Sequence, residues 1–189
     1  MQPKLIIWAL VLAVLATSGP VSSIAAKETG CIFACPEDGP KYTGALLTAI
    51  QEADRIVVTE HSSPWDAYDV QANRSRIDTE IEYARVELTA EQRHRFSEIL
   101  AKLDTKTQDW ANGCMPEIHH TVRFYGKGAV ASTMEICFTC DHVFWDAMEK
   151  VSPPGSIYDG LRKFVAAIGL HPKRDWTALA DHRIAAQKQ

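Results

Sequence analysis

The stretch that decides the fold is residues 118–138, which read IHHTVRFYGKGAVASTMEICF. Apolar Val122 and Phe124 alternate with polar neighbours, and this two-residue period is typical of a strand with one buried face. The glycines of Gly126-Lys127-Gly128 then indicate a turn, and Ala131–Phe138 has the pattern of a returning strand. Two strands joined by such a short turn predict an antiparallel hairpin.

Helical patterns lie on both sides of this hairpin. Residues Thr43–Ala53 carry a stripe of apolar side chains at helical spacing, with Thr43 as the expected N-cap. The sequence TAEQ at 89–92 forms a capping box, which predicts the start of a second amphipathic helix. Ser156 is the expected cap of a third helix, and Gly169 is the expected residue at its C-terminal end.

Further strands are expected on both sides of the hairpin. Arg55–Thr59 is rich in β-branched residues, which favour a strand. Residues 77–88 fit both a strand and a helix period, and we favour a strand over Ile81–Leu88 because the capping box follows it directly. Val143–Trp145 either continues the hairpin or forms a third strand. Together these elements predict an α+β fold, an antiparallel sheet with helices packed on one face.

The N-terminus has the layout of a secretory signal peptide. Lys4 precedes the apolar run Leu5–Ala16, and small residues up to Ala26 provide a cleavage site. The run is shorter than the roughly 20 residues needed to span a bilayer, although an uncleaved anchor is the alternative. Residues 1–26 are therefore expected to be removed, which makes the protein periplasmic or secreted.

The remaining chain, 27–189, is expected to be a single α+β domain. The full chain has 189 residues, 46% of them hydrophobic and 23% charged, as in ordinary globular proteins and unlike disordered ones. Its 20 Lys and Arg against 24 Asp and Glu give a net charge of −4, which argues against a nucleic-acid partner or attraction to membranes. Within the domain, residues 27–41 are expected to be loop-rich, and 177–189 to be a frayed tail or a short helix.

Export changes how the five cysteines are interpreted. In an oxidising compartment the usual state is a disulfide, and an odd number leaves one thiol over. We expect Cys31 to pair with Cys35, and Cys114 to pair with either Cys137 or Cys140. The second bond would tie the loop before one strand to the end of its neighbour, and closing a loop of that length stabilises by roughly 3 kcal/mol.

The C-x-x-C spacing of Cys137 and Cys140 also fits thiol-redox chemistry or a zinc site. A redox pair needs a helix after its first cysteine, whereas this pair ends an apolar strand. In a continuous strand the two side chains would lie too far apart for a disulfide, so either a turn intervenes or their partners differ. We expect no cofactor, and zinc is the one alternative. Its candidate ligands are Cys137 and Cys140, completed by Cys114 and His119, with His120 and His142 as further options.

A polar face on the first hairpin strand is another candidate site. His119, Arg123 and Tyr125 share this face, where Arg123 can hold a carboxylate or a phosphate group. The alternative is an ordinary solvent-facing surface over a sheet whose other face, with His120, is core. The sequence contains no familiar catalytic motif, and the members of Glu60-His61-Ser62 are adjacent in sequence, unlike those of a catalytic triad. We therefore expect no catalytic residues and favour a protein that is not an enzyme.

Several of these residues form a wider pattern. It consists of Cys114-Met115-Pro116, then Arg123-Phe124, then Cys137-Phe138-Thr139-Cys140. The pattern resembles one in uncharacterised exported bacterial proteins, and the segment ADRIVV at 53–58 fits the same resemblance. The resemblance implies a shared fold and an exported location, and it brings no established activity.

The function expected from the sequence is that of an exported binding protein or an accessory protein of the cell envelope. One alternative is a thiol-redox or zinc-binding protein centred on Cys137 and Cys140. Another is an inhibitor or immunity-type partner of a second exported protein, which requires a protein partner in the envelope.

Overall fold

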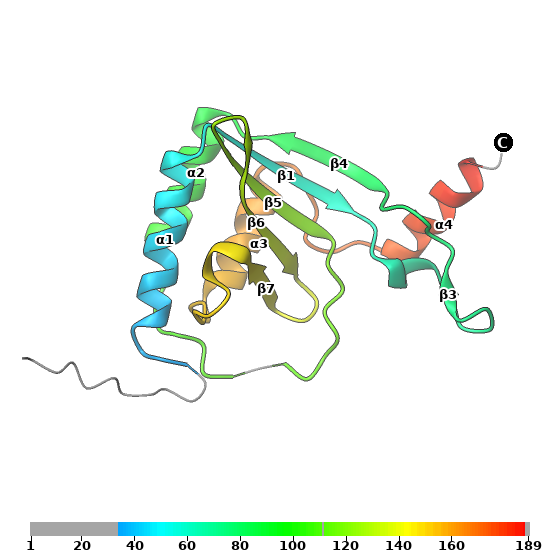
Figure 1. Cartoon of the computed structure of the whole chain (residues 1–189), viewed down its shortest axis with the longest axis horizontal. Coiled ribbons are helices and arrows are strands. Elements are labelled where there is room, and N and C mark those ends of the chain that lie inside the picture. The colour runs from blue at the N-terminus through cyan, green and yellow to red at the C-terminus, as the bar shows by residue number, and fades with distance from the viewer. Residues whose placement is uncertain (1–33, 111, 188–189) are drawn as a thin grey trace, which may run out of the picture. The chain divides into compact units, whose positions relative to one another are not determined.

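A five-stranded antiparallel sheet forms the centre of the computed structural model, which describes residues 34–110 and 112–187 (Figure 1). The strands are hydrogen-bonded in the order β4-β1-β5-β6-β7. Their bounds are β1 (Arg55–His61), β4 (Glu82–Glu87), β5 (His120–Gly126), β6 (Ala129–Cys137) and β7 (His142–Trp145). Two short strands, β2 (Tyr68–Asp69) and β3 (Arg74–Ser75), pair in a separate sheet.

The predicted hairpin is confirmed as the pair β5 and β6. Val122 lies opposite Met134 in this antiparallel register, so two apolar side chains share the same face. The turn between the strands uses Lys127 and Gly128, whose φ values are 53° and 79°. Tight hairpins require this left-handed conformation, and glycine adopts it without steric cost.

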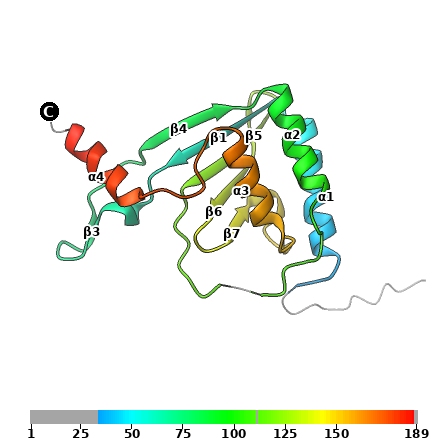
Figure 2. The ribbon, with the colours of Figure 1, turned by 180° about the vertical axis from the view of Figure 1, so that it is seen from behind.

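Three helices cover one face of the sheet, and a fourth lies apart from them (Figures 1 and 2). The helices are α1 (Asp38–Glu52), α2 (Ala90–Ala101), α3 (Ile157–Ala167) and α4 (Trp176–Ala186). α4 contacts a short 3-10 helix, η1 (Pro64–Ala67), beyond the end of β1. The predicted α+β architecture, with helices packed on one face of an antiparallel sheet, is confirmed.

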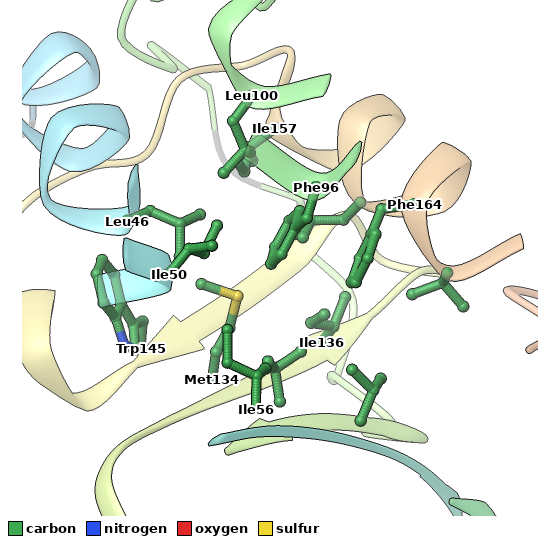
Figure 3. Packing of buried hydrophobic residues seen from close by; sticks show 14 of the residues in the cluster. Leu46, Ile50, Ile56, Phe96, Leu100, Met134, Ile136, Trp145, Ile157 and Phe164 are labelled. Carbon is green, nitrogen blue, oxygen red and sulfur yellow. The ribbon is translucent and has the colours of Figure 1, made fainter. Parts of the chain in front are cut away.

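The hydrophobic core lies between this face of the sheet and the three helices α1, α2 and α3 (Figure 3). Leu46 comes from α1, Phe96 from α2, Phe164 from α3 and Met134 from β6. The rings of Phe96 and Phe164 stack with centroids 3.8 Å apart. Burying one side chain of this size contributes about 1.5–3 kcal/mol, so these contacts hold the helices on the sheet.

The start of α1 differs from the prediction. Thr43, the expected N-cap, lies inside a helix that begins at Asp38, and its hydroxyl donates to the carbonyl of Gly39 at 2.9 Å. The N–H of Gly39 donates to Thr107 Oγ1 at 2.8 Å, and this bond satisfies an amide that has no partner within the helix. The prediction of a loop over residues 27–41 is therefore wrong from residue 38 onward, because a distant residue stabilises the first turn.

The predicted caps of α2 and α3 have different outcomes. The capping box is confirmed, because Thr89 Oγ1 accepts from the Gln92 N–H at 3.2 Å and Gln92 Oε1 accepts from the Thr89 N–H at 2.9 Å. Ser156 precedes α3 but does not cap it, because its hydroxyl donates to the carbonyl of Asp104 at 2.6 Å. Gly169 has a φ of 85° after α3, as predicted.

The remaining local predictions concern the segment after β6 and the two ends of the chain. Val143–Trp145 belongs to a third strand, β7, because a turn over residues 138–141 reverses the chain after β6. Most of the C-terminal segment is helical, since α4 extends to Ala186. The predicted signal peptide, 1–26, lies outside the described residues. Among the residues that are described, no helix has the length and apolar character needed to cross a membrane.

Candidate functional site

Five titratable side chains are buried together where β1 ends and β5 begins. They are Glu60, His61, Asp66, His119 and His120, each at most 5% exposed, and we call them the histidine–carboxylate cluster. Charged and imidazole groups are seldom fully buried unless they are paired, and buried titratable groups gather at functional sites. This cluster is therefore the candidate functional site.

Strand alternation divides the cluster between the two faces of the sheet. Glu60 follows the core residue Val58 at two-residue spacing and lies opposite His120, so both point toward the core face. His61 lies one residue further along β1, and its ring reaches Thr121 on the other face of the sheet. His119 precedes β5, and its carbonyl accepts the backbone N–H of His61 at 3.0 Å. We call Glu60 and His120 the inner half of the cluster, and Asp66 with His119 the outer half.

Glu60 is the centre of the inner half. Its carboxylate accepts a hydrogen bond from the backbone N–H of His171 and lies 3.3 Å from the guanidinium of Arg174. Both partners belong to the loop between α3 and α4, which covers this end of the core. Burial raises the pKa of Glu60, but the His120 ring, the His171 N–H and the positive charge of Arg174 outweigh it and hold the pKa below its ordinary value. The inner half therefore contains a charged Glu60 carboxylate that forms an ion pair with Arg174.

His120 is the neutral member of the inner half. Burial lowers its pKa, and the attraction of Glu60, whose Oε1 is 3.9 Å from Nε2, only partly offsets this effect. Neither ring nitrogen has a hydrogen-bond partner in the described structure. The ring is enclosed by aromatic groups, with the centroid of Phe138 4.9 Å away and that of Trp176 5.7 Å away.

Asp66 and His119 form the outer half. His119 Nε2 lies 2.8 Å from Asp66 Oδ1, and the other carboxylate oxygen accepts the backbone N–H of Ser63 at 2.8 Å. The second bond belongs to the N-terminal cap of η1, so this short helix fixes the position of the carboxylate. On the other side, Trp176 of α4 stacks on the His119 ring with centroids 4.3 Å apart. Both side chains are therefore held in one orientation before any ligand is bound.

His61 belongs to a chain of polar groups beside this pair. Its Nδ1 lies 3.3 Å from a carboxylate oxygen of Glu80, and its Nε2 lies 2.8 Å from Thr121 Oγ1. The order carboxylate, imidazole, hydroxyl matches that of a nucleophilic triad. The Thr121 hydroxyl, however, lies within β5 on a residue that is only 3% exposed, so a substrate carbonyl cannot approach it. We interpret this chain of groups as structural.

The outer half also contains a group of metal-ligand atoms. One ligand atom each from Asp66, Glu117 and His119 lies within 4.8 Å of the others. Asp66 and His119 are buried, whereas Glu117 is exposed at the rim. Carboxylate oxygen and imidazole nitrogen are ligands that zinc and other divalent transition metals use.

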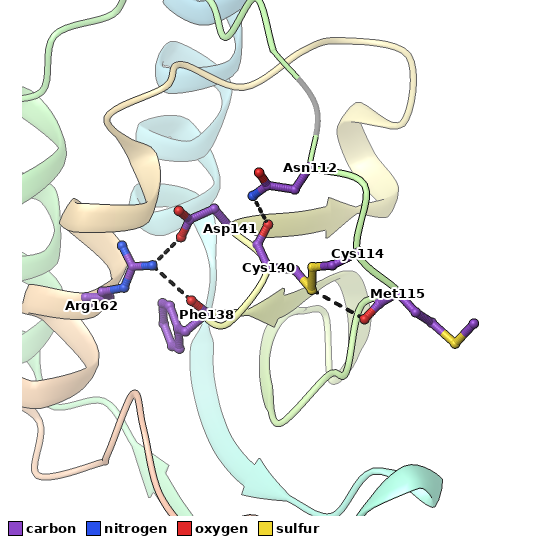
Figure 4. Close-up of a disulfide and its surroundings, with 7 residues drawn as sticks. All are labelled: Asn112, Cys114, Met115, Phe138, Cys140, Asp141 and Arg162. Atoms are coloured by element: carbon purple, nitrogen blue, oxygen red, sulfur yellow. Dashed lines mark hydrogen bonds and ion pairs between the residues drawn. A yellow bond between two sulfur atoms is a disulfide. The ribbon is translucent and has the colours of Figure 1, made fainter.

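The cysteines predicted to form a site are placed elsewhere. Cys114 and Cys140 form a disulfide with Cα atoms 6.0 Å apart, which is one of the two pairings expected for Cys114 (Figure 4). Arg162 holds the adjoining turn, because it donates to the Phe138 carbonyl at 2.9 Å and pairs with Asp141. Cys35 is disulfide-bonded, and its expected partner, Cys31, lies outside the described residues.

Cys137 is a free and fully buried cysteine at the end of β6. Cys137 and Cys140 are therefore not a dithiol pair in this structure, since the sulfur of Cys140 is bonded to Cys114. The set of zinc ligands expected from the sequence is likewise not available, because the sulfurs of Cys114 and Cys140 are bonded to each other. Both alternatives stated for this pair hold, because a turn intervenes over residues 138–141 and Cys140 has a different partner.

The predicted polar face of β5 is only partly exposed. Arg123 and Tyr125 are half-buried, and the guanidinium of Arg55 lies 4.0 Å above the Tyr125 ring. His119 and Thr121 are buried, so the expectation of a plain solvent-facing surface is wrong at this end of the strand. At about 3.3 Å per residue, His119 and Tyr125 are too far apart to hold one small ligand together.

Sequence reasoning missed most of the cluster. The signal that was present is the end of β1, where the β-branched run continues into Glu60 and His61 and the whole of RIVVTEH is buried except Arg55. Asp66 and Trp176 carried no such signal, because their roles depend on the packing of η1 and α4. Comparison with known proteins adds no further guide, because no protein-family model, no curated protein and no solved structure matches this chain.

Proposed function

We propose that this chain is an exported, non-enzymatic binding protein whose ligand is a divalent transition-metal ion. The ion would be held by Asp66, Glu117 and His119, and the observation that carries the proposal is the convergence of their ligand atoms within 4.8 Å. Two carboxylates and one imidazole leave positions open for water or for a group supplied by a partner.

The surroundings of Asp66 and His119 support this function. A metal ion would take the place of the hydrogen bond between His119 Nε2 and Asp66 Oδ1, and metal binding commonly releases protons. The Ser63 N–H already orients the carboxylate, and the Trp176 ring orients the imidazole, which are roles typical of groups around metal ligands. Glu117, at the exposed rim, completes the site with little cost of desolvation.

An exported location fits the same proposal. The sequence predicts a signal peptide, and disulfides such as Cys114–Cys140 are typical of oxidising compartments. The competing thiol-redox function has less support, because Cys140 is already bonded to Cys114 and Cys137 is buried.

The test is a titration of chelator-treated protein with zinc(II) by calorimetry, repeated with cobalt(II) by visible spectroscopy. We expect one equivalent of zinc to bind, and His119→Ala to weaken the zinc affinity by more than about tenfold. Mutating residues that only orient a metal ligand already weakens metal affinity by about that factor. His94→Ala is the matched control, because His94 is an exposed histidine on α2. The proposal fails if no stoichiometric binding occurs, or if His119→Ala binds zinc like the unchanged protein.

A further inference from the structure

The outer edge of β7 is the starting point for a second, independent inference. β7 is the last strand of the sheet on the side away from β4, and only β6 pairs with it. In an antiparallel ladder, alternate residues direct their N–H and C=O groups away from the neighbouring strand. Within residues 34–110 and 112–187, no backbone hydrogen bond from another segment reaches this side of His142–Trp145. Among the described residues, the strand therefore presents an unpaired backbone edge.

A cleft of about 780 Å³ runs along this edge, and we call it the β7 cleft. One of its walls is β7, and another is the chain at 148–153 that follows the 3-10 helix η2 (Asp146–Met148). Phe144 and Trp145 both line it although they point to opposite faces of the sheet, so the cleft extends along the edge itself. Its volume lies within the range of ligand-binding sites.

The lining of the β7 cleft differs between its two sides. Val143 and Trp145 point to the core face, where Tyr42 and Met148 continue an apolar wall. The Tyr42 side chain is almost completely buried, and its hydroxyl has no hydrogen-bond partner in the described structure.

The other side of the cleft is acidic. Glu135 lies opposite Phe144 in the register of β6 and β7, on the face away from the core. Asp146 and Glu149 add two more carboxylates to the lining, against the single amine of Lys150. Phe144 itself is 45% exposed and adds apolar surface beside these carboxylates. This side therefore suits a chain that carries positive charge on apolar stems.

We propose that the β7 cleft binds an extended peptide segment of a partner protein, which joins the sheet as a strand beside β7. Strand addition satisfies the free backbone groups, and the side chains of the added strand alternate between the two faces. Apolar side chains would meet Val143 and Tyr42, and basic side chains would meet Glu135 and Asp146. The partner segment is thus an extended run of alternating apolar and basic residues.

The experiment uses a fluorescein-labelled heptapeptide of alternating lysine and valine, and measures fluorescence anisotropy at physiological salt with a chelator present. The chelator keeps this test separate from the metal proposal. We expect saturable binding, at least about tenfold tighter than that of the corresponding glutamate–valine peptide, which the cleft repels. Hydrogen exchange should show new protection at the alternate β7 amides that point away from β6 when the lysine peptide binds.

Two matched variants complete the test. Phe144→Lys places a charge on the edge strand and should weaken binding by at least about tenfold, since edge lysines block strand addition. Val130→Lys is the control, because Val130 is 48% exposed on β6 but does not line the cleft. Equal binding of the two peptides, an unaffected Phe144→Lys variant, or a free protein that dimerises through β7 would each overturn the proposal.

Discussion

The inner and outer halves of the histidine–carboxylate cluster contain similar side chains in different electrostatic settings. In the inner half, the buried carboxylate of Glu60 has a cationic partner, Arg174, 3.3 Å away. In the outer half, Asp66 is paired with an imidazole, and its nearest acidic neighbour at the rim is Glu117. The charge of the inner carboxylate is thus balanced by the protein itself, although Glu60 Oε2 and both ring nitrogens of His120 have no hydrogen-bond partner in the described structure. The outer half instead gathers two carboxylates whose charge a cation can balance.

On the proposed function, this difference separates a structural role of the inner half from a metal-binding role of the outer half. The charge of a buried carboxylate that is paired with a guanidinium is already compensated, so the pair does not favour a bound cation. Removing either partner leaves an uncompensated buried charge. Two carboxylates and an imidazole without a guanidinium among them favour a metal ion. The comparison therefore predicts that changes in the inner half act on stability and changes in the outer half act on metal affinity.

The largest expected effect is on stability. Glu60→Leu removes the buried carboxylate and leaves Arg174 and the His171 N–H without their acceptor, so the free energy of unfolding should fall by about 3 kcal/mol. Urea denaturation followed by circular dichroism measures it. Glu87→Gln is the control, because Glu87 forms an exposed ion pair with Arg55 at 3.7 Å, and such pairs contribute less than about 1 kcal/mol. Equal losses in both variants would show that the inner half has no structural role.

An intermediate effect on stability is expected when the pH is lowered. The pKa of His120 lies below its ordinary value of 6.5, so the unfolded chain takes up that proton first and stability falls as the pH drops below 6.5. The pKa of Glu60 lies below 4.5, so its contribution is present above that pH and is lost as the pH falls through the lower, folded value. Acid should therefore weaken the protein in two stages.

The variant His120→Gln isolates the first of these stages. Between pH 7 and pH 5, the unchanged protein should lose about 1 kcal/mol more of its free energy of unfolding than the variant does. Urea denaturation at both pH values measures the difference, with His94→Gln as the exposed control. If His120→Gln loses as much as the unchanged protein, the buried imidazole is not the source of the first stage.

The smallest expected effect is on tryptophan fluorescence. Trp176 stacks on His119, so copper(II) bound at the outer half should quench its fluorescence. Trp176→Phe should reduce that quenching while weakening zinc affinity less than His119→Ala does, because phenylalanine keeps an aromatic ring against the imidazole and neither ring donates an electron pair to the metal. Trp110→Phe serves as the comparison, since Trp110 contacts Tyr158 instead. Undiminished quenching in Trp176→Phe would place the bound metal away from His119.

Local signals in the sequence were sufficient for much of the fold. The hairpin of β5 and β6 follows from alternation over residues 118–138, and the capping box at Thr89 fixes the start of α2 within its own first turn. The start of α1 did not follow, because Thr107 supplies the bond to Gly39 from a segment far along the chain. Local patterns cannot show contacts of that kind.

The candidate site was largely hidden for the same reason. Asp66 and His119 are separated by 53 residues, and Glu60 and His171 by 111, so each pair exists only after the sheet and the loop between α3 and α4 are in place. The sequence did single out His119, but with cysteines and with Arg123 as its companions. Those partners were chosen by spacing along a strand, whereas the actual partners approach from η1 and α4.

The disulfide has a consequence for the order in which the protein matures. Cys114 begins the short segment that carries Glu117 and His119, and its bond to Cys140 fastens that segment to the turn between β6 and β7. In a reducing cytosol this bond does not persist, and the rim of the outer half loses its tether. On the proposed function, the nascent chain would cross the reducing cytosol with an incomplete site and acquire its ion only at its destination.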